Sequence, residues 1–154
     1  MGRENQSSAG ARHRLPSVEP ARSRNMAAIR SRNTRPELLV RSVVHRLGYR
    51  FRLHHRDLPG TPDLVLPRYR AAIFVHGCFW HAHSCRSGSR CPRTNTAYWT
   101  AKRHRNRARD RRACLALRKD GWRVLTVWEC ETKDLVRLAS RLRSFLERLS
   151  PIRS

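Results

Sequence analysis

The segment that most constrains this chain runs from His76 to Cys85 and carries two cysteines, three histidines and two large aromatic residues within ten positions. Cys78, His83 and Cys85 offer thiolate and imidazole ligands within eight residues. Zn²⁺ binds sulfur and nitrogen ligands of this kind in a tetrahedron. The spacing therefore predicts a zinc site whose fourth ligand comes from elsewhere in the chain.

The fourth ligand has four candidates, which are His81, Cys91, Cys114 and Cys130. Cys114 falls on the apolar side of a predicted helix, where a buried structural thiol is the better interpretation. Cys130 ends a predicted strand, and a ligand so distant would constrain the largest loop of the unfolded chain. Four protein ligands would leave no position for water and would make the metal structural. The alternative is a set of unrelated core cysteines and surface histidines.

The chain is strongly basic, with 34 Lys and Arg against 11 Asp and Glu and a formal net charge of +23. The excess is mostly arginine, whose guanidinium binds phosphate through two parallel hydrogen bonds, so we expect a nucleic-acid partner. The sequence contains neither a long apolar run nor the apolar core of a signal peptide. We therefore expect a cytoplasmic protein that binds no membrane and keeps its cysteines reduced.

The pattern of apolar residues predicts one domain of the α/β class. Residues 1–24 are basic and contain few apolar residues, which predicts a disordered arm before a domain over residues 25–150. The elements follow in the order α-β-β-β-α-β-α. Helices are expected at 34–47, 96–119 and 135–149, and strands at 49–53, 63–66, 71–75 and 122–128.

A second polar group lies where two predicted strands begin and end. Asp63 opens one strand, and His76 follows the next. Many nucleases hold Mg²⁺ with a carboxylate placed in this way, and Glu37 on the first helix adds a second acid. The plainer alternative is that Asp63, which follows a proline, is only a turn residue.

His76 and His81 are available for acid–base chemistry if Cys130 completes the zinc ligands, because imidazole exchanges protons near neutral pH. Either residue could equally be a loop histidine. Asp110 is an acid among several arginines of the long helix. It could orient one histidine or simply neutralise its neighbours.

Several motifs in one order resemble the very short patch repair endonucleases of bacteria. These motifs are Pro59–Asp63, His76–His81, Tyr98–Trp99, Arg109–Arg112 and Gly121–Cys130. The resemblance covers about residues 23–149 and implies a restriction-endonuclease-like core with a mixed central sheet flanked by helices. It also implies Mg²⁺-dependent nicking of one DNA strand on the 5′ side of the thymine in a T:G mismatch, which arises when 5-methylcytosine deaminates.

The resemblance also implies roles for individual residues. Asp63 and the main-chain carbonyl of Val75 would bind Mg²⁺, and Glu37 would reach it through water. His76 and His81 would act at the scissile phosphate, with His81 as the water-activating base paired with Asp110. Structural zinc would be held by Cys78, His83, Cys85 and Cys130. The position of Val75 is often threonine in the family, and valine keeps the carbonyl.

The aromatic residues Phe79, Trp80 and Trp99 resemble a wedge that enters DNA beside the mismatch, and Met26 resembles a residue that enters from the minor groove. Core packing is the alternative for the aromatics. The resemblance implies a monomer that acts on double-stranded DNA and works with a DNA cytosine-5 methyltransferase and mismatch-repair proteins. The rival functions are a restriction-type endonuclease on matched DNA and a non-catalytic zinc-stabilised DNA-binding protein.

Overall fold

The computed structural model of the chain describes residues 32–149 and residue 151. The predicted basic arm and Met26 lie outside the described residues. Among the helices that are described, none is long and apolar enough to cross a membrane.

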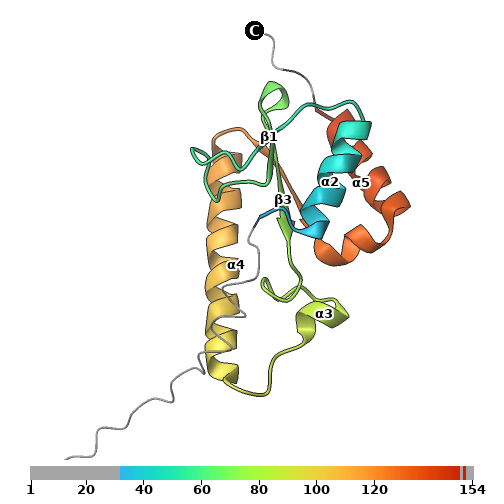
Figure 1. The fold of residues 1–154 in the computed structure, drawn as a ribbon. Helices are drawn as coiled ribbons and strands as arrows, with labels where there is room; N and C mark the ends of the chain where they lie inside the picture. Colours follow the sequence, from blue (N-terminus) through green and yellow to red (C-terminus); the bar gives the residue numbers. More distant parts are fainter. Residues whose placement is uncertain (1–31, 150, 152–154) are drawn as a thin grey trace, which may run out of the picture. The chain divides into compact units, whose positions relative to one another are not determined.

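A four-stranded sheet forms the centre of the described part (Figure 1). Its strands lie in sequence order and are β1 (Arg52–Leu53), β2 (Leu64–Leu66), β3 (Ala71–His76) and β4 (Arg123–Trp128). The first two pairings are antiparallel, and β3 pairs with β4 in parallel. The sheet is therefore mixed, as the sequence predicted. The parallel pair requires a crossover, which the long helix between β3 and β4 provides.

Helices cover both faces of this sheet (Figure 1). The main ones are α2 (Arg35–Arg46) and α5 (Leu135–Glu147) on one side and α4 (Thr96–Lys119) on the other. Three short elements join them, namely η1 (Pro67–Tyr69), α3 (Arg86–Ser89) and η2 (Glu129–Lys133). Within the described residues the order of the longer elements agrees with the predicted α-β-β-β-α-β-α.

The alternation of side chains along β3 divides the core between the two faces. Ile73 packs with the buried aliphatic residues of α2 and α5, such as Val44 and Leu142. Ala72 and Phe74 point to the other face and form a smaller cluster with Leu117 of α4. Because β3 is packed on both faces, the position of its final residue, His76, is well defined.

One local prediction differs from the structure. The expected strand at 49–53 pairs with β2 only at Arg52 and Leu53, because β2 ends at Leu66 and the residues that would face 49 and 50 in this register lie in η1. Tyr49 and Phe51 still pack against the main core. At the start of α2 the hydroxyl of Thr34 donates to the Glu37 carboxylate over 2.9 Å instead of capping the helix backbone.

Candidate active site and metal centre

The parallel pairing of β3 with β4 brings two distant segments together at one end of the sheet. His76 ends β3 and lies beside Trp128, which ends β4. Because the strands run in the same direction, the residues that follow them also meet. The backbone N–H of Cys130 donates to Sγ of Cys78 over 3.3 Å. This is how a cysteine after β4 reaches the loop after β3.

Four metal-capable side chains converge at this contact, namely Cys78, His83, Cys85 and Cys130. Their ligand atoms all lie within 4.8 Å of one another, and Sγ of Cys130 is 3.5 Å from Nδ1 of His83. This cluster could hold a metal ion. Of the candidates for its fourth member, Cys130 is the one that joins it, whereas His81 belongs to a second group and Cys114 lines a cavity.

The chemistry of the cluster fits a metal ion that binds thiolates. Burial raises the pKa of the Cys78 thiol to about 12, because a thiolate without a nearby cation is unfavourable there. The interaction with His83 lowers the pKa of the Cys85 thiol to about 6. A bound cation would stabilise the Cys78 thiolate, so the thiol would lose its proton despite its burial. Three sulfurs and one nitrogen form a donor set that suits zinc.

A second group consists of His76, His81 and Asp110, whose ligand atoms also lie within 4.8 Å of one another. The two imidazole rings stack, and Nδ1 of His81 donates to the Asp110 carboxylate on α4. Burial, together with the neighbouring His81, lowers the pKa of His76 to about 4. Burial alone would raise the pKa of Asp110, but the hydrogen bond from His81 and the nearby His81, His76 and Arg109 together outweigh it, and the pKa is lowered. The pairing of Asp110 with His81 is thus present.

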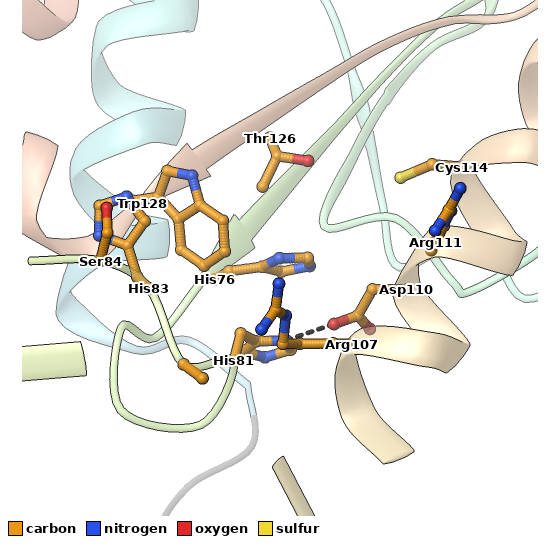
Figure 2. Close-up of a pocket in the computed structure, with 11 residues that line it drawn as sticks. His76, His81, His83, Ser84, Arg107, Asp110, Arg111, Cys114, Thr126 and Trp128 are labelled. Atoms are coloured by element: carbon orange, nitrogen blue, oxygen red, sulfur yellow. Dashed lines mark hydrogen bonds and ion pairs between the residues drawn. The ribbon is translucent and has the colours of Figure 1, made fainter. Parts of the chain in front are cut away.

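This histidine pair faces an open cavity of about 390 Å³ between β3, β4 and α4 (Figure 2). Arg107 and Arg111 of α4 line it together with Asp110. Figure 2 shows the dashed contact between His81 and Asp110 at its centre. A cavity with neutral imidazole on one side and guanidinium groups on another can hold a phosphate and move a proton beside it.

The ring of Trp128 separates the two groups, a role that the sequence interpretation missed. It stacks on the His83 ring with centroids 4.3 Å apart and meets the His76 ring edge-on at 5.4 Å. Its position at the end of β4, two residues before Cys130, was the signal that could have identified it. Trp128 lies between the one imidazole that joins the thiols, His83, and the two that lie with Asp110.

Asp63 lies just before β2 and reaches across to β3. Its Oδ2 accepts the backbone N–H of Val75 over 2.7 Å. Burial raises the pKa of Asp63 to about 6, even though the hydrogen bond from the Val75 N–H acts in the opposite direction. A buried carboxylate with a penalty of this kind would gain from a bound cation.

Glu37 is buried at the start of α2, and both of its carboxylate oxygens already accept hydrogen bonds. Oε1 accepts the Thr34 hydroxyl, and Oε2 accepts both the Asn33 N–H and the Arg41 guanidinium. Arg41 also donates to Nε2 of His54 over 3.1 Å, and Nδ1 of His54 lies 3.9 Å from Asp63. The two predicted acids are therefore connected through side chains that the sequence interpretation missed. The spacing of Arg41 four residues after Glu37 was the available signal.

The three predicted wedge residues gather at the start of α4. The Phe79 ring lies 5.2 Å from Trp80 and 5.5 Å from Trp99, and all three side chains are half-buried. The ammonium of Lys102 lies 5.4 Å from the centre of the Trp80 ring. The main core residues are elsewhere, so the aromatics form a separate surface cluster beside a basic helix.

The sheet order, the covering helices and the position of the buried acid define a restriction-endonuclease-like fold. A solved structure supports this class, because the catalytic domain of the homing endonuclease I-Bth0305I matches with a TM-score of 0.51 over 75% of this chain and 96% of that domain, at 21% identity. The family model described as DNA mismatch endonuclease Vsr matches residues 18–87.

Two relatives extend the match beyond those residues. The type II nicking enzyme V.XorIIP of Xanthomonas oryzae pv. oryzae is 54% identical over 131 residues, covering 84% of this chain and 96% of the relative. The DNA mismatch endonuclease Vsr of Escherichia coli K12 is 44% identical over 117 residues, which cover 76% of this chain and 74% of the relative. The chain therefore belongs to the Vsr family of DNA mismatch endonucleases, which confirms the family that the motifs indicated.

Proposed function

We propose that this protein nicks one strand of double-stranded DNA on the 5′ side of the thymine in a T:G mismatch and thereby starts very short patch repair of deaminated 5-methylcytosine. Membership of a mismatch endonuclease family supports the reaction class. The observation that carries the proposal is that the ten residues 76–85 contribute to three neighbouring groups: the metal cluster, the histidine pair and the aromatic cluster.

The histidine pair would handle the protons of the reaction. Asp110 holds Nδ1 of His81, so Nε2 is the nitrogen that can take a proton from water. His76 is neutral near pH 7, because its pKa is about 4. It can therefore donate or accept a hydrogen bond at the phosphate without adding a second buried charge. The arginines of the cavity would hold the phosphate in place.

Asp63 and the carbonyl of Val75 are the proposed direct ligands of Mg²⁺. When bound, Mg²⁺ would neutralise charge at the scissile phosphate and lower the pKa of an attacking water. Glu37 already accepts three hydrogen bonds. This supports a contact through water rather than direct coordination.

Zinc in the cluster of Cys78, His83, Cys85 and Cys130 would be structural. With four protein ligands it would have no open position for water. It would join the loop after β3 to the end of β4 and thereby fix His76 and His81 relative to the sheet.

The aromatic cluster would enter the base stack beside the mismatch. Separating a base step costs a few kcal/mol and costs least where the pair is already mismatched, so insertion itself favours mismatched DNA. Met26 would enter from the minor groove. A monomer would suffice for one nick, and functional pairing with a DNA cytosine-5 methyltransferase and mismatch-repair proteins follows from the proposed origin of the mismatch.

A nicking assay tests this proposal. Duplexes with a T:G mismatch in randomised flanks and matched duplexes of the same sequences are incubated with Mg²⁺ or with EDTA, and the labelled strands are resolved. We expect one nick in the thymine strand, with Mg²⁺ only. Equal double-strand cleavage of matched DNA would favour a restriction-type enzyme. Binding without any cleavage would favour a non-catalytic DNA-binding protein.

A further inference from the structure

Arg103 differs from the other basic residues of α4 because its side chain is buried. The residue is 8% exposed, whereas most arginines of this helix face solvent. Nη1 donates to the Arg90 carbonyl over 3.1 Å, and Nη2 donates to the Gly88 carbonyl. Within the described part of the chain, no carboxylate forms an ion pair with Arg103, and its Nε has no hydrogen-bond partner. Burying a guanidinium in this way is costly, so the two carbonyls must be important to its position.

One of these carbonyls belongs to the segment that surrounds the metal cluster. Gly88 lies so close to His83 that an added Cβ would stand 2.1 Å from the His83 carbonyl oxygen. Cys85 directly precedes α3, the short helix that contains Gly88. Arg103 therefore holds the segment around Gly88, which lies against His83 and directly after Cys85 of the metal cluster.

The same guanidinium lies over an aromatic ring. Its carbon Cζ is 5.4 Å from the centre of the Phe79 ring. The Phe79 ring contacts both other members of the aromatic cluster, Trp80 and Trp99, whose rings lie 6.1 Å from each other. One turn further along α4, the Asn106 amide donates to the Trp80 carbonyl over 3.1 Å. This face of α4 thus supports the loop on which the first two aromatics stand.

We propose that Arg103 is a positioning residue that fixes Phe79 against the Cys/His segment, so that the aromatic cluster meets DNA as a rigid wedge. The inference rests on the proposed function, because it assumes that Phe79 enters the base stack. The planar guanidinium can donate to two carbonyls and still present its face to a ring, which a lysine ammonium cannot do. A wedge that is held in this way loses little conformational entropy on insertion, which favours binding.

The test measures insertion at equilibrium, without divalent metal, so that no cleavage is involved. Duplexes with T:G or matched pairs carry 2-aminopurine at the adjacent step, whose fluorescence rises on unstacking. Arg103→Leu should lower the preference for T:G over matched DNA by about tenfold. It should also reduce the fluorescence rise to the level of Phe79→Ala. In the double variant that combines Arg103→Leu with Phe79→Ala, the preference for T:G should fall no further than in Phe79→Ala alone.

Three controls separate the possible outcomes. Arg105→Leu removes the same charge from the exposed side of α4 and should weaken both duplexes equally. If Phe79→Ala keeps both the preference and the fluorescence rise, the wedge itself is wrong. If Phe79→Ala loses them but Arg103→Leu keeps them, the positioning role of Arg103 is wrong while the proposed function stands. Should Arg103→Leu fail to fold by melting analysis, Arg103→Lys must show a smaller loss of the same kind, and unchanged preference would overturn the inference.

Discussion

The imidazole rings of His76 and His81 stack face to face, with centroids 4.1 Å apart and an angle of 4° between their planes. Two imidazoles this close cannot both be positively charged imidazolium ions without a large repulsion. Burial lowers the pKa of His76 to about 4, so His76 is neutral near pH 7. Asp110 orients the other ring. The arrangement assigns different tasks to two histidines that look equivalent in the sequence.

The contact between Asp110 and His81 gives the first prediction. Asp110→Asn should lower the single-turnover nicking rate by about a hundredfold or more, because a neutral amide neither holds the ring tautomer nor stabilises imidazolium. The affinity of this variant for T:G duplex should stay within a few-fold of that of the unaltered protein. Asp120→Asn at the end of α4 is a matched control that should nick normally. A rate unchanged in Asp110→Asn would contradict a role for this pair in proton transfer.

The metal cluster gives the second prediction. Cys130→Ser should purify with less bound zinc and melt at a lower temperature, because the loop after β3 loses its connection to β4. A stability loss of about 2–3 kcal/mol would lower Tm by roughly 10 °C. Metal content by atomic absorption and thermal melting measure this. Cys91→Ser, at an exposed position outside the cluster, should retain full metal and Tm. Equal metal content in both variants would exclude Cys130 as a ligand.

Asp63 gives the third prediction. Asp63→Asn keeps the size of the side chain and its ability to accept the Val75 N–H, but it loses the charge that attracts a divalent cation. Nicking in Mg²⁺ should fall below detection, while T:G duplex binding persists or tightens since one negative charge is removed near phosphate. Gel shift and nicking assays measure the two effects. Asp57→Asn, whose carboxylate is exposed, serves as the control. Substantial nicking by Asp63→Asn would exclude this acid as an essential ligand.

The connection between the two acids gives the fourth prediction. Arg41→Met should remove one of the two donors to Oε2 of Glu37 and the donor to Nε2 of His54, so that the side chains that connect Glu37 to Asp63 are no longer held together. We expect the Mg²⁺ concentration for half-maximal nicking to rise several-fold, with the rate at saturating Mg²⁺ less affected. Titration of the nicking rate with Mg²⁺ measures this. Arg46→Met at the exposed end of α2 should leave the titration unchanged. A fall in maximal rate alone would contradict a role in metal affinity.

Some features of the fold could be predicted because they depend on local patterns. The α4 helix begins at Thr96 and ends at Lys119 as expected, since Gly121 and the long run of helix-forming residues define it. The period-two pattern at 49–53 gave a weaker result. Side chains of that segment do pack against the core, but its backbone pairs over two residues only, because the chain opposite it enters η1 at Pro67 and is no longer a strand.

The candidate site was predictable to the extent that its residues are close in sequence. Cys78, His83 and Cys85 suggested a metal cluster by spacing alone, and the choice of Cys130 from spacing remained open among four candidates. Arg41, His54, Arg103 and Trp128 were missed. Their importance comes from contacts between elements that lie far apart in the chain, such as the 3.1 Å hydrogen bond between Arg41 and His54.

By itself, the sequence determined the chemistry that residues 76–85 contain: thiols for a soft metal, imidazoles for protons and aromatic rings for stacking. It also determined the basic charge suited to DNA, because charge and ligand type are properties of the residues themselves. Only the tertiary structure decided how these groups are sorted. The parallel register of β3 and β4 sets Cys130 beside Cys78 and places Trp128 between two sets of histidines. Such sorting depends on strand pairing across 52 positions, which no local pattern specifies.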